Sequence, residues 1–328
     1  MKKIAKKLFA NSFYIRIVLV KLKLRELKKH KKIESNKRSF IINEYVKYYG
    51  SVPDLESPKS FSEKLLWLKL NYYKKEYADL TDKHLSKEKI SNIIGKDISV
   101  RTLKTFSSPS KLDFTALPNK FVIKMNNGSG YIFLVERTGK KYRIVNIKEK
   151  DKVRYNLRRI KLLFKYLFKI DYYLSSFEWN YKGIVPLIIA EEYIENHGGL
   201  VDYKFFVNYG KLICFYAVFG RLEKVHSNYY DDKKNFMNVT AASPPDEFGI
   251  TLPANIDTMI EYALLIGKNI PLVRVDLYNL NGEIKFGELT FFHQGGHVEY
   301  YYPENFNETL GQKINIDDLL KDYERDND

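Results

Sequence analysis

The chain has 328 residues, which is enough for two or three packed subdomains around a shared core. Hydrophobic residues make up 45% of it and aromatic residues 15%, which excludes a disordered protein, and one cysteine excludes a disulfide framework or a cysteine-rich zinc site. No apolar stretch is long enough to span a bilayer and no signal-peptide pattern follows the N-terminus, so the expected location is the cytoplasm.

The charge distribution distinguishes the N-terminal end of the chain. The net charge is +15, and much of it lies in the first forty residues. Residues 1–38 are predicted to form a basic amphipathic arm of one or two helices. This arm can lie on an anionic membrane surface with Phe13 and Tyr14 at the headgroups, or its apolar stripe can pack on the body of the protein. The charge belongs to no recognisable RNA module, so no nucleic-acid partner is expected.

Residues 39–105 are predicted to form a helical region that leads into the main fold and ends in a strand over 98–106. Within it, Thr81 or Asp82 can cap a helix on which Lys83 and Lys87 stand one turn apart on the same side. A solvated charged helix face is the ordinary interpretation of this lysine pair.

A glycine-rich loop follows in the stretch F-V-I-K-M-N-N-G-S-G-Y-I-F-L-V. The pattern predicts a buried strand that ends in Lys124, a Gly-Ser-Gly loop and a second strand. Backbone N–H groups of such a loop can surround phosphate oxygens, and the lysine adds a positive charge. The loop is neither a Walker loop nor a dinucleotide fingerprint, so an ordinary hairpin is the alternative. Residues 148–173 are expected to form a basic helix with a buried apolar stripe.

An apolar strand, I-V-P-L-I-I-A, leads into the segment E-E-Y-I at 191–194. Carboxylates at a strand end beside apolar residues can contact an adenine amino group and ribose hydroxyls. A two-stranded ribbon that turns at 208–211 is expected next, followed by a long irregular polar stretch over 222–249 that is functional or mobile. Residues 253–270 are predicted to form a helix, and a short acidic helix is expected in the tail at 313–328.

The stretch from 273 to 296 has the clearest functional pattern. Its Asn-Gly pair at 281–282 predicts a β-hairpin. Side chains alternate along a strand, so one face should carry Arg274, Asp276, Glu288 and Thr290. Two carboxylates from adjacent strands form a hard-oxygen site suited to Mg2+ that bridges phosphates. An edge hairpin with a solvated polar face is the alternative.

The order of these stretches resembles the ATP-grasp superfamily and, within it, the TupA-like ATP-grasp proteins of bacterial surface-polysaccharide gene clusters. The matching stretches are N-K-F-V-I-K-M-N-N-G-S-G, E-E-Y-I with D-Y-K-F-F, and V-R-V-D-L-Y with F-G-E-L-T-F. The resemblance implies an α+β ATP-grasp fold in which two α+β subdomains clasp ATP after a helical N-terminal lead-in. Residues 106–190 would form the first subdomain, and residues 191–312 the second, with the metal site.

The resemblance also implies a role for each matching residue. The residues expected to bind ATP are Lys87, Lys124, Asn127, Gly128, Ser129, Gly130, Glu191, Glu192, Tyr193, Ile194, Asp202 and Lys204. The residues expected to hold Mg2+ are Asp276, Glu288 and Thr290. Arg274 and Lys204 are the expected catalytic residues, because cations there stabilise the charge of the reacting groups. Lys233 and Lys234 stand where related ligases place a mobile loop over the phosphates.

Several positions depart from the family's pattern. Many ATP-grasp ligases have Asn in place of Thr290, although the TupA-like pattern tends to Thr. That pattern usually has Arg in place of Lys87 and His in place of Asn127. The histidines at 293 and 297 flank a glycine turn, where a helical metal pair cannot form, so they are interpreted as turn or substrate-pocket residues.

The resemblance implies an ATP-dependent carboxylate–amine ligase that forms an amide through an acyl phosphate. The family's setting implies a uronic acid of a capsule, O-antigen or teichuronopeptide precursor and an amino acid or amine as substrates, with peripheral membrane contact through residues 1–38. One alternative is a glycosyltransferase of the same pathway that uses Asp231 and Asp232 as its metal and nucleotide-sugar pair. A non-enzymatic nucleotide-binding relic or membrane-surface scaffold is another.

Overall fold

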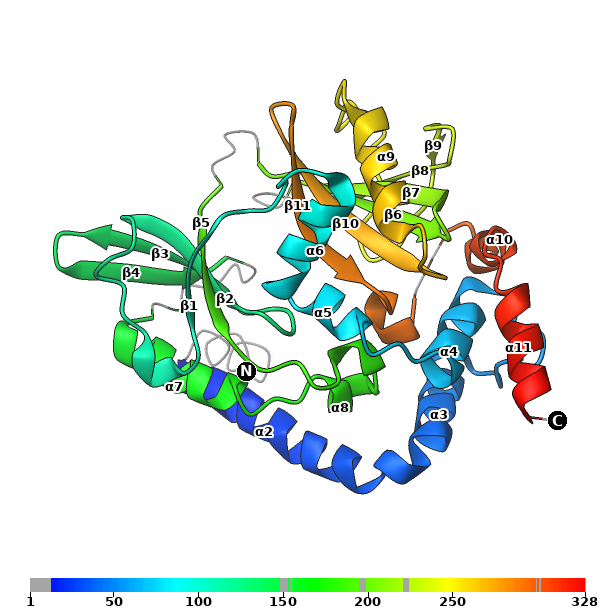
Figure 1. Ribbon diagram of the computed structural model, residues 1–328, viewed down its shortest axis with the longest axis horizontal. Coiled ribbons are helices and arrows are strands. Elements are labelled where there is room, and N and C mark those ends of the chain that lie inside the picture. The colour runs from blue at the N-terminus through cyan, green and yellow to red at the C-terminus, as the bar shows by residue number, and fades with distance from the viewer. Residues whose placement is uncertain are drawn as a thin grey trace, which may run out of the picture.

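Two antiparallel β-sheets lying side by side form the framework of the protein (Figure 1). The computed structural model describes residues 13–147, 153, 155–194, 199–220, 224–298, 300 and 302–327. The first twelve residues of the predicted arm and residues 148–152 of the predicted basic helix therefore lie outside the described residues.

The first sheet contains the glycine-rich loop. Its strands are β1 (Thr102–Phe106), β2 (Lys120–Met125), β3 (Ile132–Thr138), β4 (Lys141–Asn146) and β5 (Ile188–Glu192). They lie in the order β1-β5-β2-β3-β4, so β2 pairs with both β3 and β5. Alternate residues of β2 are buried, and the ring of Phe133 on β3 lies 5.8 Å from that of Phe164 on helix α7 (Leu157–Leu167). One face of β2 is thus covered by the core, and its other face is only partly buried.

The second sheet contains the predicted hairpin. Its strands are β6 (Asp202–Asn208), β7 (Lys211–Phe219), β8 (His226–Tyr230), β9 (Phe236–Met237), β10 (Val273–Leu280) and β11 (Glu283–Thr290). They lie in the order β11-β10-β6-β7-β8-β9, and helix α9 (Ile256–Gly267) packs on β6, β7 and β10. Asn281 and Gly282 both have positive φ, as a two-residue hairpin turn of this kind requires.

The prediction of an irregular stretch over 222–249 is wrong, because this stretch supplies β8 and β9. Tyr229 and Tyr230 of β8 are buried, and their rings stack on those of Tyr216 and Phe215 in β7. Aromatic stacking between β7 and β8 therefore stabilises β8 as a strand, although the polar composition of this segment does not predict one.

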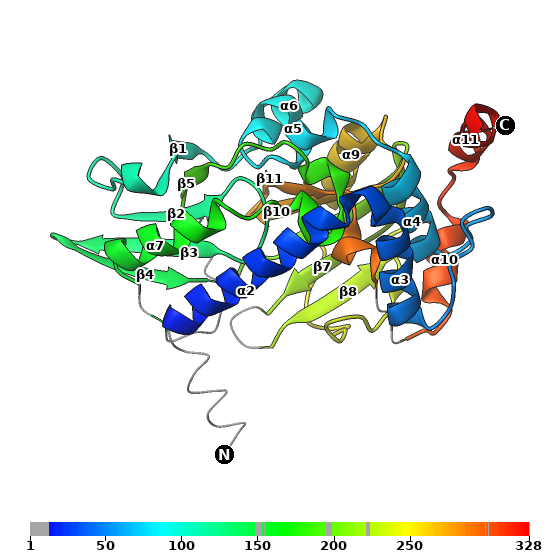
Figure 2. The same ribbon diagram turned by 90° about the horizontal axis from the view of Figure 1, so that it is seen from below.

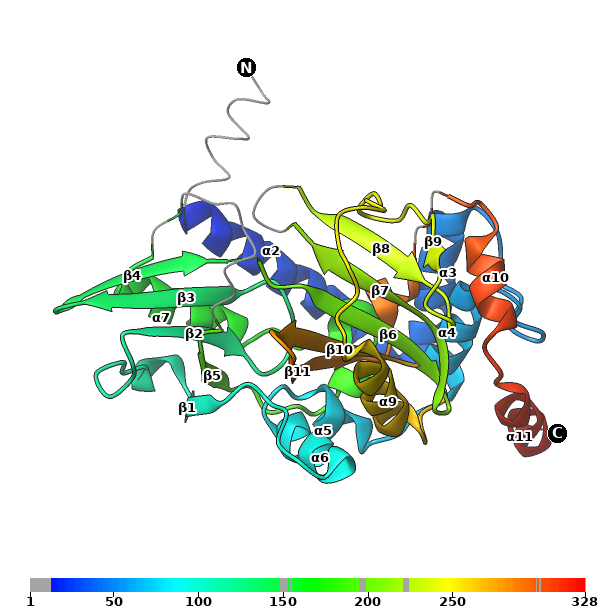
Figure 3. The ribbon, with the colours of Figure 1, turned by 90° about the horizontal axis from the view of Figure 1, so that it is seen from above.

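Helices enclose the two sheets and connect them. The helices not yet named are α2 (Phe13–Lys32), α3 (Lys37–Tyr49), α4 (Phe61–Asn71), α5 (Tyr77–Thr81), α6 (Leu85–Ile94), α8 (Tyr173–Ser176), α10 (Phe306–Gln312) and α11 (Asp317–Asn327), with single 3-10 turns η1 (Glu34–Asn36), η2 (Pro109–Lys111), η3 (Trp179–Tyr181) and η4 (His293–Gly296). Helices are therefore present where the lead-in and the acidic tail were predicted. Figure 3 shows α5, α6 and α9 on one side of the β10–β11 hairpin.

The packing of helix α2 shows where the apolar stripe of the predicted basic arm lies. It packs on α7 and α8 and buries Phe13, Ile17, Val20 and Leu27, so its apolar stripe contacts the body of the protein. Figure 2 shows its other side on the outside of the molecule. None of the helices in the described ranges is both long enough and apolar enough to cross a membrane.

Candidate active site

Two lysines share one buried carboxylate at the centre of the first sheet. Lys124 of β2 and Lys87 of α6 contact different oxygens of Glu191 in β5, with Nζ–O distances of 2.5 and 2.7 Å. Burial lowers the pKa of Lys87, although Glu191 acts in the opposite direction. Burial opposes the charge on Glu191, but the two lysines outweigh it and lower the pKa of the carboxyl group. Two residues that the sequence places 37 positions apart are thus held side by side as cations.

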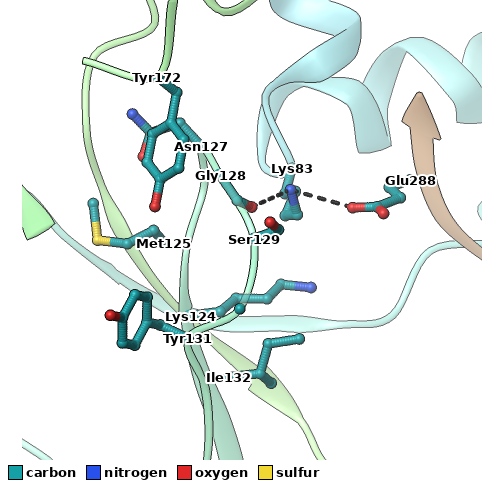
Figure 4. Close-up of a pocket in the computed structure, with 11 residues that line it drawn as sticks. Lys83, Lys124, Met125, Asn127, Gly128, Ser129, Tyr131, Ile132, Tyr172 and Glu288 are labelled. Carbon is teal, nitrogen blue, oxygen red and sulfur yellow. Dashed lines mark hydrogen bonds and ion pairs between the residues drawn. The ribbon is translucent and has the colours of Figure 1, made fainter. Parts of the chain in front are cut away.

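The glycine-rich loop borders an open pocket (Figure 4). The lining includes Lys83, Lys124, Met125, Asn127, Gly128, Ser129, Gly130, Tyr131, Ile132, Tyr172 and Glu288. A Cβ atom on Gly128 would lie 2.0 Å from the Cζ of Tyr172, and the φ of this glycine is +84°. Only glycine fits between the loop and this ring. The side-chain oxygen of Asn127 is buried and has no hydrogen-bond partner among the described residues, which leaves it available to a ligand.

Lys83 connects the two sheets. Its Nζ donates a hydrogen bond to the carbonyl of Gly128 at 2.9 Å and lies 3.3 Å from Oε2 of Glu288 on β11 (Figure 4). The backbone N–H of Lys83 donates to the carbonyl of Asn126, whose side chain in turn donates to Asp82. Sequence reasoning selected Lys87 and missed Lys83, because both lysines have the same spacing signal and the contact between 82 and 126 decides where each one points.

A β-bulge between Asp276 and Leu277 sets the register of the β10–β11 hairpin. Arg274 lies opposite Thr290, and Asp276 lies opposite Glu288. The guanidinium of Arg274 donates to both oxygens of Asp276, at 2.7 and 2.8 Å, and to the hydroxyl of Thr290 at 2.9 Å. The prediction that these four side chains share a face is confirmed by this pairing.

Lys204 extends the same polar face onto β6. It lies opposite Asp276 in the sheet, forms an ion pair with that carboxylate and contacts Asp202 at 2.8 Å. Burial opposes the charge on Lys204, but Asp276 and Asp202 outweigh it and raise the pKa of the ammonium group. The candidate catalytic lysine therefore stays charged at neutral pH.

The glycine turn η4 adds a histidine to this cluster. Nδ1 of His293 accepts a hydrogen bond of 2.6 Å from Arg274, which requires the imidazole to be neutral at that nitrogen. Burial, together with the charges of Arg274 and Lys204, lowers the pKa of His293 well below its ordinary value. His293 lies in the glycine turn, as one of its two interpretations predicts, and a role in a substrate pocket stays a prediction.

Some predicted residues lie away from the charged cluster. Glu192 is exposed, and the ring of Tyr193 lies under Lys120, 4.2 Å from its Nζ. Ile194 follows them, half-buried, beyond the end of β5.

The structure does not bring Lys233 and Lys234 to the cluster. They lie on the turn after β8, at the opposite edge of the second sheet from β10 and β11, and Lys234 pairs with Asp257 at 2.7 Å. Asp231 accepts hydrogen bonds from its own turn, and Asp232 pairs with Lys313. The aspartate pair considered for a glycosyltransferase thus has a structural role.

The carboxylates of the hairpin suit a magnesium ion that carries phosphates. Asp276 and Glu288 face each other from paired strands, and carboxylate oxygens are ligands that Mg2+ prefers. Among the described residues, no group of three or more His, Cys, Asp or Glu side chains could hold a metal by itself. Mg2+ commonly binds through one or two carboxylates together with substrate phosphates and water. The donor set therefore fits Mg2+ that arrives with a nucleotide, and the Thr290 hydroxyl is the third protein oxygen nearby.

The sequence matches the TupA-like ATPgrasp family over residues 63–315, which is more than half of the chain. The chain belongs to the TupA-like ATP-grasp family. This membership confirms the predictions of the ATP-grasp fold and of an ATP-dependent ligase. The roles of single residues and the subdomain boundaries stay predictions. A search of curated proteins found no match.

Several solved ligases are similar to the chain at low identity. D-alanine–D-alanine ligase from Bacillus anthracis is 18% identical, with 75% of this chain and 69% of that chain covered and a TM-score of 0.39. The macrocyclase MdnC from Microcystis aeruginosa, bound with the precursor peptide MdnA, is 11% identical, with 89% and 70% covered and a TM-score of 0.37. The ATP-grasp ligase PsnB, complexed with its minimal precursor, is 11% identical, with 80% and 68% covered and a TM-score of 0.36. The assignment rests on the family match alone.

Proposed function

We propose that this protein joins a carboxylate to an amine through an acyl phosphate, with a uronic acid of a bacterial surface-polysaccharide precursor as the carboxylate substrate. The observation that carries the proposal is the cluster of five cations and four carboxylates between the two sheets. Its members are Lys83, Lys87, Lys124, Lys204, Arg274, Glu191, Asp202, Asp276 and Glu288. Cations that outnumber their partners at a glycine-rich loop suit a polyphosphate.

The first sheet would hold the nucleotide. Lys87 and Lys124 are fixed by Glu191 on the side of the sheet where the glycine-rich loop begins, so their charges are aligned before a ligand arrives. The backbone N–H groups of 127–130 would contact phosphate oxygens, and residues 191–194 together with Asp202 would contact adenine and ribose. Because the two lysine side chains are already positioned, nucleotide binding would cost little additional side-chain entropy.

The second sheet would hold Mg2+ and the reacting groups. Asp276 and Glu288 are the proposed ligands, and bound Mg2+ supplies charge neutralisation for the phosphates. Arg274 and Lys204 now neutralise Asp276, so they lie where negative charge has to be stabilised. In this proposal they turn toward the carboxylate substrate and the transferred phosphoryl group when the metal takes over Asp276.

The charge of the protein favours an acidic second substrate. The chain carries a net charge of +15, and a basic surface raises the local concentration of anions. A uronic acid brings both the anionic character and the carboxylate that needs activation. An amino acid or a simple amine would then be the nucleophile.

The test measures ADP release by the purified protein with ATP, Mg2+ and a set of substrates. The set combines D-glucuronic and D-galacturonic acid, free and nucleotide-linked, with glycine, L-alanine, L-lysine and ethanolamine. ADP release that needs both a uronate and an amine is the expected result, and the Asp276→Asn variant should lose it. Uronate-dependent release no greater than that of Asp276→Asn would overturn the proposal.

We further propose that α2 holds the protein at an anionic membrane surface, where a lipid-linked acidic precursor is assembled. Tyr14, Val18 and Leu22 are 71%, 51% and 50% exposed and are spaced four apart, so they share the outward face of the helix. Arg25, Lys29 and Lys32 continue this face toward its C-terminal end. Exposed apolar residues followed by cations fit the interface of an anionic bilayer.

A further inference from the structure

A second charged cluster lies beside the candidate active site, around the glycine turn η4. Nζ of Lys69 in α4 donates a hydrogen bond of 3.0 Å to the carbonyl of Gly295. A Cβ atom on Gly295 would lie 3.5 Å from Oε1 of Glu178, so this carboxylate lies directly over the turn. The hydroxyl of Ser176 donates to the same carboxylate oxygen. None of these residues belongs to the predicted nucleotide or metal site.

Two tyrosines connect this cluster to the pocket. Tyr172 lines the pocket together with Glu288, and its ring lies 5.9 Å from that of Tyr181. Burial raises the pKa of Tyr181, and the nearby carboxylates of Glu178 and Glu288 raise it further. The Tyr181 side chain thus lies near both Glu178 and Glu288.

The turn itself makes a second connection. His293 begins η4 and accepts a hydrogen bond from Arg274, while Gly295 in the same turn contacts Lys69 and approaches Glu178. The turn therefore has the metal site on one side and the second cluster on the other.

Glu178 has acceptor capacity that the protein does not use. A carboxylate can accept about four hydrogen bonds, and the described contacts of Glu178 supply one, from Ser176. Lys69 is the cation nearby, but in the described part of the chain no ion pair joins a cation to Glu178, and its side chain is partly buried. Burial raises the pKa of Glu178, although Lys69 and Ser176 act in the opposite direction. A partly buried carboxylate that its nearby cation does not contact directly can bind a second one.

We propose that Glu178 binds the ammonium group of the amine substrate and accepts its proton. The inference rests on the proposed ligase function, and it names the residue that prepares the nucleophile. One proton of the ammonium passes to Glu178, and the free nitrogen lone pair forms the C–N bond. The C–O bond to phosphate breaks, its electron pair leaves with phosphate, and the second nitrogen proton passes to this leaving group. Glu178 then releases its proton to solvent.

The neighbours of Glu178 have supporting roles in this step. Lys69 is a positioning residue, because its bond to the Gly295 carbonyl fixes the turn under the carboxylate. Tyr172, which lines the pocket with Glu288, and Tyr181 form an aromatic pair that can contact the apolar part of the acceptor. Lys69 comes from α4 and the two tyrosines come from the segment around α8 and η3, so neither part of the chain alone produces the site.

The test compares an ammonium nucleophile with hydroxylamine, which is uncharged at neutral pH and needs no proton removed before it attacks. For wild type and Glu178→Gln, ADP release is measured with ATP, Mg2+ and the uronate that supports turnover. The nucleophile is either hydroxylamine or the best of glycine, L-alanine, L-lysine and ethanolamine. The ratio of the amine rate to the hydroxylamine rate should fall by about 100-fold or more in the variant, the usual contribution of a positioned base. Glu261→Gln, which removes an exposed carboxylate of α9, should leave the ratio unchanged.

The outcomes separate the two proposals. If wild type releases no ADP with any uronate and either nucleophile, the proposed function fails and this inference fails with it. If wild type is active and the ratio is the same in Glu178→Gln, or if hydroxylamine is used but no ammonium compound is, the inference alone is overturned. If Glu178→Gln does not fold, Glu178→Asp replaces it, and its shorter carboxylate should lower the ratio while the hydroxylamine reaction continues.

Discussion

Asp276 and Glu288 lie opposite each other on β10 and β11, and each is already paired with a cation. Lys204 contacts the first and Lys83 the second, so the two carboxylates converge without an unbalanced negative charge. A metal ion that binds there has to replace the two ammonium groups. Those groups are then free to turn to phosphate oxygens, which links metal binding to nucleotide binding.

Removal of Asp276 should therefore affect both stability and activity. Asp276→Ala leaves Lys204 with Asp202 alone and Arg274 without its two strongest acceptors, at a buried place. We expect the free energy of unfolding to fall by about 3–5 kcal/mol, as for other broken buried pairs, and ADP release to be lost. Urea unfolding followed by fluorescence gives the first value.

The control for this loss is the hairpin's other carboxylate. Glu288 is partly exposed, so Glu288→Ala should cost less than about 1 kcal/mol of stability and still abolish ADP release. Equal stability losses in the two variants would contradict the interpretation that Asp276 is buried and Glu288 is partly exposed.

The face of the hairpin could be predicted in part, because alternation is a local rule. Alternation predicts that Arg274 and Asp276 share a face of β10, and that Glu288 and Thr290 share a face of β11. The two pairs lie opposite each other only because a β-bulge between Asp276 and Leu277 shifts the register set by the turn, and the sequence did not predict this bulge. The loop of Gly128 was found by local rules as well, since strand, glycine turn and strand follow each other directly.

Residues that depend on long-range contacts could not be predicted. Lys83 reaches Glu288 because Asn126 holds Asp82 across 44 positions of the chain, which no spacing rule encodes. Glu178 and Lys69 are single charged residues in apolar and aromatic stretches, and they meet only where the turn at Gly295 passes between them. Strand β8 was missed because its stabilising contacts are aromatic rings on β7 and not an apolar alternation of its own.

Gly128→Ala should weaken ATP binding. Its Cβ would overlap the ring of Tyr172, and the positive φ adds about 1–2 kcal/mol of strain, so the loop has to move. We expect the dissociation constant for ATP with Mg2+, measured by calorimetry, to rise at least about tenfold.

Gly50→Ala is the matched control for the loop variant. Gly50 also has a positive φ, of +74°, but its Cβ would meet no atom within 4 Å. This variant should lose a similar strain energy from the fold and leave the ATP affinity unchanged. A weaker affinity in both variants would show that the effect is general and does not come from the contact with Tyr172.

Lys69 should make stability depend on pH in the alkaline range. Burial lowers its pKa from 10.5 to about 8, although Glu178 acts against this, and the other titratable group beside it is His297. Below pH 8 the lysine is charged in both the folded and the unfolded chain. Between 8 and 10.5 the unfolded chain binds more protons, so stability rises with pH by about 3 kcal/mol from this group.

The measurement for Lys69 is the difference in unfolding free energy between wild type and Lys69→Met from pH 7 to 10.5. The difference should change in favour of wild type across this range, because methionine has no proton to lose. Lys268→Met, at an exposed lysine, should give a constant difference instead. A constant difference for Lys69→Met as well would mean that this ammonium group keeps its ordinary pKa.

The outward face of α2 should bind anionic membranes. Leu22→Glu places a negative charge on the apolar row of Tyr14, Val18 and Leu22 and removes an apolar side chain whose burial contributes about 1.5–3 kcal/mol. Binding to vesicles of phosphatidylcholine with phosphatidylglycerol, measured by cosedimentation, should fall at least about tenfold.

Val52→Glu, at a valine that is 77% exposed outside α2, introduces the same charge and should leave binding unchanged. Binding of wild type should also weaken as salt is raised, because Arg25, Lys29 and Lys32 contribute through their charge. Equal binding to vesicles of pure phosphatidylcholine, or equal losses in the two variants, would show that this face of α2 does not recognise an anionic bilayer.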